Sequence, residues 1–127
     1  MVKLYVAFSL EQKNVFDIIY YVSYKLQIFI VKKTLYFIEW LDSLKDKQAQ
    51  KKVAARILRL EYGLLGDVEY FRGIGELKIN YGPGYRVYFV KQGKQIILLL
   101  NAGDKSTQQK DIEKALQLVK EMKHGNY

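Results

Sequence analysis

Hydrophobic and polar residues alternate most clearly in Gly73–Val90, which reads GIGELKINYGPGYRVYFV. A period of two is typical of β-strands, so this stretch predicts a hairpin with strands at Glu76–Tyr81 and Tyr85–Val90. The Gly-Pro-Gly segment at residues 82–84 supplies the backbone conformations that a tight turn needs. We expect a three-residue loop, because a two-residue type II turn would splay the strands and shift the register by one residue.

The expected register divides the hairpin into an apolar face and a polar face. The apolar face carries Leu77, Ile79, Tyr81, Tyr85, Val87 and Phe89. On the polar face, Asn80 lies opposite Arg86, and Lys78 lies opposite Tyr88. The polar face therefore combines two cations, an amide and a phenol, which makes it a candidate functional site.

A strand and two helices are predicted before the hairpin. Leu26–Lys33 is rich in β-branched residues, which favours a strand, and Thr34 can then cap a helix over Leu35–Lys45. The apolar residues of that helix recur at helical spacing and are Phe37, Trp40, Leu41 and Leu44. Asp46 is the expected N-cap of a second helix that ends at Tyr62. Two helices with a short link predict an antiparallel helical hairpin.

The remaining segments complete an α+β pattern. Gly63–Gly75 contains several glycines and indicates a loop or an irregular strand. Gln95–Asn101 is almost entirely apolar, as in a central strand covered on both faces, and an amphipathic helix follows from about Thr107 to Lys123. We therefore predict an α+β domain: a small, twisted, mainly antiparallel sheet with an N-terminal helical hairpin and a C-terminal helix.

Composition limits the chemistry. The 127 residues carry a net charge of +8, which indicates either a polyanionic partner or a solvated basic surface. The second helix presents basic residues on or beside its exposed side, namely Lys47, Lys51, Lys52, Arg56 and Arg59. The chain has no cysteine and a single histidine, His124, which excludes disulfides, a Ser-His-Asp triad and a histidine-rich metal site. We expect no metal and no cofactor.

Residues 1–25 differ from the rest and are treated as an N-terminal extension to a domain at residues 26–127. The segment is nearly neutral, and no small-residue cleavage site follows its apolar part, which argues against a signal peptide. Val15–Val31 is interrupted by Asp17 and Lys25 and is too short for a membrane span. An extra helix packed on the domain and a start site assigned too early both remain open. We expect a cytoplasmic protein.

Several motifs occur in order along the chain. They are F-x-x-W-L-x-x-L from Phe37, G-x-x-G-D-V from Gly63, G-x-G-E-L-K-I from Gly73, G-P-G-Y-R-V-Y-F from Gly82 and G-D-K-S-T-Q-x-x-D-I from Gly103. Together they resemble the RelE/ParE superfamily of type II toxins, specifically the addiction module killer protein branch close to HigB-type toxins. The resemblance runs from about Ile28 to Glu121, outside residues 1–25.

This resemblance implies a RelE-like fold and a toxin held in a hetero-oligomer by an antitoxin, usually a helix-turn-helix protein. RelE-like members cleave mRNA in the ribosomal A site, whereas ParE-like members poison DNA gyrase. Lys78 matches a catalytic lysine of RelE-like toxins, Arg86 matches the arginine of their G-Y-R motif, and Lys105 replaces a second arginine. Two positions depart from RelE: Asn80 replaces a second lysine, and Asp111 stands about where RelE has a catalytic tyrosine.

The residues themselves suit metal-free RNA cleavage, in which a 2′-hydroxyl attacks the adjacent phosphorus. The reaction needs a base, cations around the phosphate and an acid for the leaving oxygen. Arg86 suits bidentate phosphate contact, and Lys105 suits the phosphate or the leaving group. Lys78 would serve as the base only with a lowered pKa, an effect expected from nearby Arg86. Glu76 and Asp111 are the alternative bases.

Two questions remain open from the sequence. Tyr85 and Tyr88 could stack on a base or donate a proton, and both also suit a packing role. Lys78 and Arg86 also suit a solvated edge. The function expected first is a ribosome-dependent mRNA endonuclease with the ribosome and mRNA as partners. The alternatives are a ParE-like gyrase inhibitor and a non-catalytic protein that binds only RNA or antitoxin.

Overall fold

The computed structural model describes residues 14–18 and 28–123. Most of the predicted extension, the start of the predicted first strand at Leu26 and the tail residue His124 lie outside these residues. Among the described helices, none combines the length and the apolar character that crossing a membrane requires.

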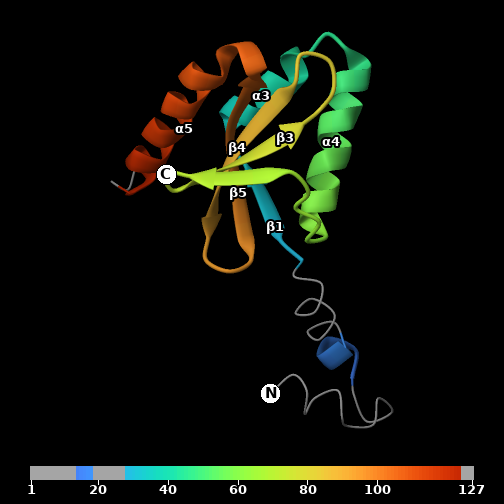
Figure 1. Ribbon diagram of the computed structural model, residues 1–127. Coiled ribbons are helices and arrows are strands. Elements are labelled where there is room, and N and C mark those ends of the chain that lie inside the picture. Colours follow the sequence, from blue (N-terminus) through green and yellow to red (C-terminus); the bar gives the residue numbers. More distant parts are fainter. Residues whose placement is uncertain (1–13, 19–27, 124–127) are drawn as a thin grey trace.

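Five strands form one sheet in the order β1-β5-β4-β3-β2 (Figure 1). Their bounds are β1 Ile30–Lys33, β2 Val68–Phe71, β3 Ile74–Ile79, β4 Tyr85–Gln92 and β5 Ile96–Asp104. β1 pairs with β5 in parallel, and the other three pairings are antiparallel. The prediction of a mainly antiparallel sheet with a central apolar strand is confirmed, although β5 extends three residues beyond Asn101.

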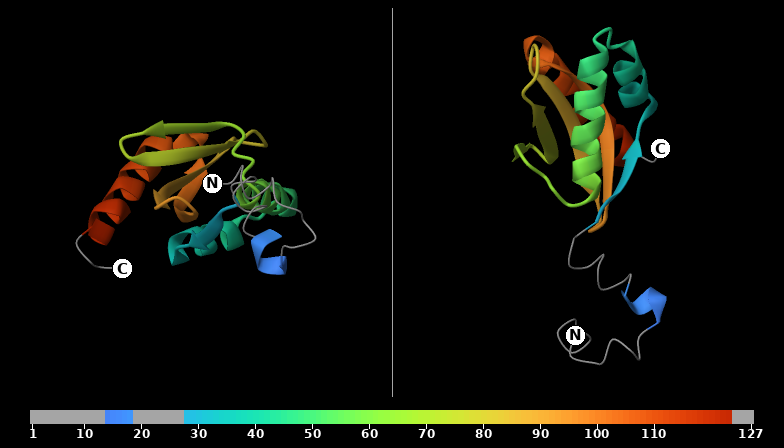
Figure 2. Two further views of the ribbon diagram at one scale, coloured as in Figure 1. Left: turned by 90° about the horizontal axis from the view of Figure 1, so that it is seen from below. Right: turned by 90° about the vertical axis from the view of Figure 1, so that its right-hand side faces the viewer.

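The helices that follow β1 lie on both faces of this sheet. They are α3 Leu35–Ser43, α4 Lys47–Glu61, the 3-10 helix η2 Lys105–Thr107 and α5 Gln108–Lys123. Both predicted N-caps are confirmed, since Thr34 accepts from the backbone N–H of Phe37, and Asp46 accepts from those of residues 48 and 49. Figure 2 shows α3 and α4 on one side of the sheet and α5 on the other.

Each face of the sheet has its own core. On the α3 and α4 side, the expected apolar face of the hairpin is confirmed, with Leu77, Ile79, Tyr85, Val87 and Phe89 all buried. On the opposite side, α5 packs on a second core of Ile74, Tyr88, Val90, Leu100, Ile112, Ala115 and Leu118. The face that the sequence marks as polar is therefore partly covered by a helix.

The register of the hairpin differs from the prediction. Lys78 pairs with Arg86 rather than with Tyr88, and Tyr88 pairs with Glu76. The loop between β3 and β4 spans residues 80–84 rather than the three residues expected. Within it, the Gly84 amide donates to the Tyr81 carbonyl and closes a turn. The shift is by two residues, which moves each partner along the strand but leaves every side chain on its predicted face.

The segment left open as a loop or irregular strand contains a regular strand, β2. Arg72 and Gly73 connect it to β3, both with positive φ angles of 51° and 84°. Two such residues in succession suit the tight hairpin turn whose twist matches that of the strands. The turn makes β2 the edge of the sheet beside β3.

Candidate functional site

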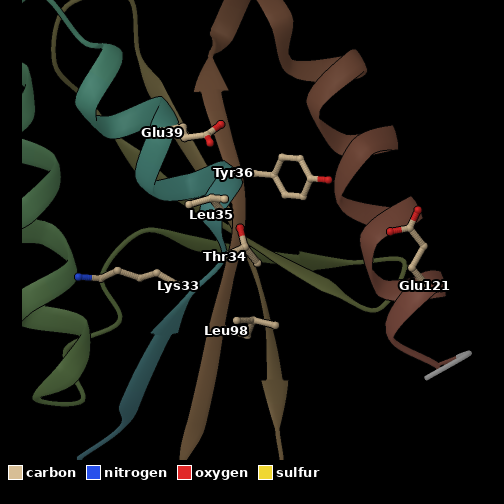
Figure 3. A pocket seen from close by; sticks show the side chains of 7 residues that line it. All are labelled: Lys33, Thr34, Leu35, Tyr36, Glu39, Leu98 and Glu121. Carbon is tan, nitrogen blue, oxygen red and sulfur yellow. The ribbon is translucent and has the colours of Figure 1, made fainter. Parts of the chain in front are cut away.

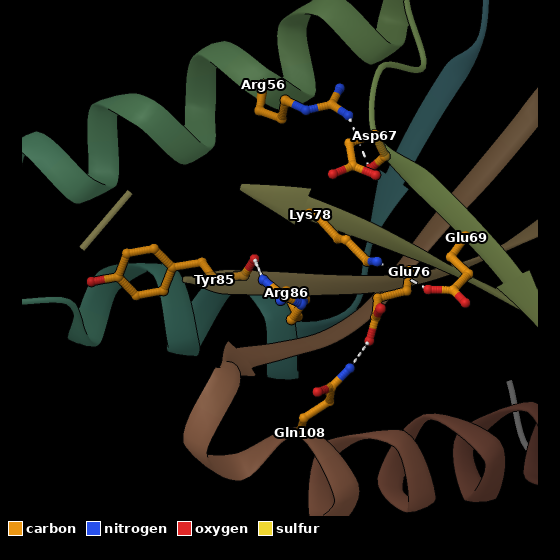
Figure 4. A network of polar contacts seen from close by, with 8 residues as sticks. All are labelled: Arg56, Asp67, Glu69, Glu76, Lys78, Tyr85, Arg86 and Gln108. Carbon is orange, nitrogen blue, oxygen red and sulfur yellow. Dashed lines mark hydrogen bonds and ion pairs between the residues drawn. The ribbon is translucent and has the colours of Figure 1, made fainter. Parts of the chain in front are cut away.

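Two rows of side chains cross the sheet face on which α5 packs. Figure 4 shows four of their members, namely Glu69, Glu76, Lys78 and Arg86. In the first row, Glu69 pairs with Glu76, Glu76 with Tyr88, and Tyr88 with Asn101. In the second row, Lys78 on β3 pairs with Arg86 on β4, and Arg86 pairs with Gly103 on β5. Lys105 follows β5 directly. We call Lys78, Arg86 and Lys105 the cationic row.

Lys78 is held by a carboxylate that the sequence did not suggest. Its Nζ lies 3.0 Å from Oε2 of Glu69, with 27% of the Lys78 side chain and 59% of the Glu69 side chain exposed. The hydrogen bond and the negative charge of Glu69 raise the pKa of Lys78. The lowering expected from Arg86 is therefore wrong, because the ion pair with Glu69 favours the charged form of Lys78.

Arg86 and Lys105 lie close together around Gly84. The NH1 nitrogen of Arg86 donates to the Tyr85 carbonyl at 3.2 Å, while its Nε is buried without a hydrogen-bond partner among the described residues. A Cβ atom at Gly84 would lie 3.5 Å from that NH1 and 3.8 Å from the Cβ of Lys105. Gly84 therefore lies between the Arg86 guanidinium and the start of the Lys105 side chain.

Glu76 and Tyr88 are buried between the sheet and α5, with 1% and 0% of their surfaces exposed. Oε2 of Glu76 accepts a hydrogen bond from Nε2 of Gln108 at 2.8 Å. Burial and the Glu76 carboxylate raise the pKa of the Tyr88 hydroxyl. Because α5 covers the ring, Tyr88 suits the packing role that the sequence left open.

Tyr85 is also a packing residue. Its ring belongs to the core under α3 and α4, and it meets Trp40 edge-on at 5.8 Å between centroids. Alternation along β4 points Tyr85 away from Arg86, which favours the packing role that the sequence left open. Trp40, one of the apolar residues of the first predicted helix, packs on this core through the contact with Tyr85.

Asp111 and Asn80 lie beside the cationic row rather than in it. Asp111 accepts from the Thr107 hydroxyl at 2.6 Å, and a Cβ on Gly103 would lie 1.8 Å from the same carboxylate oxygen. Burial raises the pKa of Asp111. Asn80 is exposed and, with Lys78, lines a hollow of about 500 Å³ between α4 and the hairpin.

Arg56 is not part of an exposed basic stripe, as the sequence suggested, but is 5% exposed. Its guanidinium donates to the carbonyls of Leu64, Leu65 and Asp67, and burial lowers its pKa. It therefore fixes the loop that leads into β2. The basic residues of α4 that remain exposed are Lys47, Lys51, Lys52 and Arg59.

A second hollow, of about 510 Å³, lies where α3 begins, beside β5 and the end of α5 (Figure 3). Its lining includes Lys33, Tyr36, Glu39 and Glu121, and none of the predicted site residues. The described residues contain no cluster of three or more histidine, cysteine or acidic side chains that could hold a metal ion.

Comparison with known proteins shows the family to which the chain belongs. Residues 39–122 match the family described as phage derived protein Gp49-like (DUF891). The chain belongs to this family. An uncharacterized protein of Haemophilus influenzae is 47% identical over 93 residues, which cover 72% of this chain and 94% of the relative.

Gp49-like proteins are a RelE-like toxin family, so the comparison supports the toxin resemblance at this coarser level. The matched range contains the whole cationic row together with Glu69 and Gln108. Sequence reasoning missed these last two residues. Glu69 was missed because β2 was not recognised, and Gln108 because its contact with Glu76 depends on how α5 packs.

Proposed function

We propose that this Gp49-like protein is the toxin of a type II toxin-antitoxin system, close to the HigB-like branch, and that it cleaves mRNA on the ribosome without a metal. The observation that carries the proposal is the cationic row, in which Lys78 and Arg86 pair across two strands and Lys105 approaches Arg86 at Gly84. Three cations at one place on a partly exposed face suit a phosphodiester, whose charge rises in the transition state.

Arg86 is the central residue of the proposed mechanism. Its position between Lys78 and Lys105 suits contact with the two non-bridging oxygens of one phosphate, and its half-buried position strengthens that contact relative to water. Lys78 and Lys105 would contribute further positive charge. The attacking 2′-hydroxyl would yield a 2′,3′-cyclic phosphate and a 5′-hydroxyl end.

The proposal includes the usual partners of such a toxin. An antitoxin, expected to be a helix-turn-helix protein, would form a hetero-oligomer with the toxin in the cytoplasm and neutralise it. The ribosome and mRNA would be its targets. The net charge of +8 and the exposed basic residues of α4 support binding to RNA.

Primer extension on mRNA from a cell-free translation reaction tests the proposal. Wild type, Arg86→Ala and Lys78→Ala are compared with Arg72→Ala, which removes an exposed arginine outside the cationic row. We expect new 5′ ends that require ribosomes, unchanged cleavage by the control, and a loss of about 100-fold or more for Arg86→Ala, as for removal of an oxyanion-stabilising donor.

A gyrase-directed toxin is the second candidate. The observation in its favour is that the three bases expected from the sequence are poorly suited: Lys78 stays charged, Glu76 is buried, and Asp111 is held by a hydroxyl. Intact mRNA beside trapped gyrase–DNA breaks would replace the nuclease with this function. Binding to RNA or antitoxin without either activity would indicate a non-catalytic protein.

A further inference from the structure

The proposed cleavage requires a group that accepts the proton of the attacking 2′-hydroxyl. Lys78 does not suit this role because its pKa is raised by Glu69. Glu76 is 1% exposed under α5, and Asp111 is partly buried and bonded to Thr107. An accessible carboxylate beside the cationic row would supply the missing base.

Glu69 on β2 has this property. Its side chain is 59% exposed, and one carboxylate oxygen lies 3.0 Å from Nζ of Lys78. Its pairing with Glu76 puts it on the same face of the sheet as Lys78 and Arg86. Asp67, whose charge also acts on Lys78, lies on the side of Arg56 instead (Figure 4).

The order of the elements also suits the geometry of the reaction. Glu69, Lys78 and Arg86 lie on the successive strands β2, β3 and β4, and Lys105 follows β5. Because β4 lies between β3 and β5 in the sheet, Glu69 and Lys105 lie on opposite sides of Arg86. An in-line displacement has the same requirement, because the attacking and leaving oxygens stand on opposite sides of the phosphorus.

We propose that Glu69 is the general base of the cleavage reaction, an inference that rests on the proposed nuclease function. Glu69 takes the proton of the 2′-hydroxyl as the 2′-oxygen forms a bond to phosphorus. The bond from phosphorus to the 5′-oxygen breaks, and that oxygen keeps the electron pair and takes a proton from the Lys105 ammonium. Water then removes the proton from Glu69 and returns one to Lys105. Throughout, Lys78 holds the carboxylate in place.

The test compares Glu69→Gln and Glu69→Asp with wild type in the cell-free cleavage reaction. Glu113→Gln is the matched control, because Glu113 is exposed and forms a similar ion pair of 3.1 Å with Arg72, away from the cationic row. Exposed ion pairs contribute little to stability, so all these variants are expected to fold, and thermal melting verifies this. Sedimentation with mRNA-programmed ribosomes measures binding separately from cleavage.

We expect Glu69→Gln to lose about 100-fold or more in cleavage rate, the usual contribution of a general base, while ribosome binding changes less than threefold. Glu69→Asp keeps part of the rate, and Glu113→Gln cleaves like wild type. A Glu69→Gln variant that cleaves as fast as wild type, or faster, overturns the role of Glu69 but leaves the nuclease intact. A wild-type protein that cleaves nothing overturns the nuclease and this inference together.

Discussion

The two faces of the sheet are covered in different ways. On one face, α3 and α4 close an apolar core in which all the inward-facing hairpin side chains are hydrophobic or aromatic. On the other face, α5 covers Glu76, Tyr88 and Asn101, which each leave a buried polar atom without a hydrogen-bond partner among the described residues. Beside them, the cationic row remains partly exposed.

This difference separates stability from function. A buried apolar side chain contributes through transfer from water and close packing, whereas a buried polar atom without a partner costs free energy. The α3 and α4 face is therefore expected to carry most of the stability of the domain. The α5 face gives up stability at the place where the cations are held, as is common at functional sites.

The largest loss of stability is expected on the α3 and α4 face, and replacing Phe89 tests it. Its fully buried ring lies against Gly75, where a Cβ would come within 2.3 Å of the ring, and against Tyr70. We expect Phe89→Ala to lower the free energy of unfolding by about 3–5 kcal/mol, because it leaves a large cavity. Denaturant unfolding followed by circular dichroism measures the change.

Tyr88→Phe tests the α5 face in the same way, because Tyr88 is next to Phe89 on β4 but points to the opposite face. This variant removes a buried hydroxyl that lies near the Glu76 carboxylate without a well-aligned hydrogen bond, so the free energy of unfolding should change by no more than about 1 kcal/mol. A loss of 2 kcal/mol or more in Tyr88→Phe would show that the hydroxyl is well bonded and that the two faces are less different than we infer.

Gly103→Ala tests how closely the start of α5 packs against β5. The added Cβ would overlap the Asp111 carboxylate at 1.8 Å and the Thr107 hydroxyl at 2.7 Å. We expect a loss of about 1–3 kcal/mol in the free energy of unfolding, the usual cost of overpacking. Adding Asp111→Ala should restore part of it in a double-mutant cycle. Equal losses in the presence and absence of Asp111 would contradict this contact.

The sequence predicted what depends on local periodicity. Alternation along the hairpin placed Lys78 and Arg86 on one face, and this was correct even though the register was wrong, because the error was by two residues. What α5 covers could not be predicted in the same way. Tyr88 lies on the polar face, and only tertiary packing decides that it is buried rather than exposed.

Two other residues show where local reasoning ends. Arg56 is an ordinary member of a basic stripe in the sequence, and its burial depends on three carbonyls that a loop with Gly66 at a φ of 63° presents to it. Glu69 lies on a four-residue strand, and the glycines on either side of that strand made the segment resemble a loop. Neither the loop around Arg56 nor the ion pair between Glu69 and Lys78 produces a periodic pattern of hydrophobic and polar residues in the sequence.

The smallest expected effect concerns Asp111 and depends on pH. Burial raises the pKa of Asp111 above its usual 3.8, so the ionised carboxylate costs stability in the folded state. Below pH 3.8 the carboxyl is neutral in both states and the cost is absent; the cost appears as the pH rises through 3.8 and is complete above the folded pKa. Asp111→Asn should therefore be slightly more stable than wild type at pH 7, and this gain should vanish at pH 3. Thermal unfolding at both pH values measures the difference, and a gain that is the same at both would show that the amide acts through packing rather than charge.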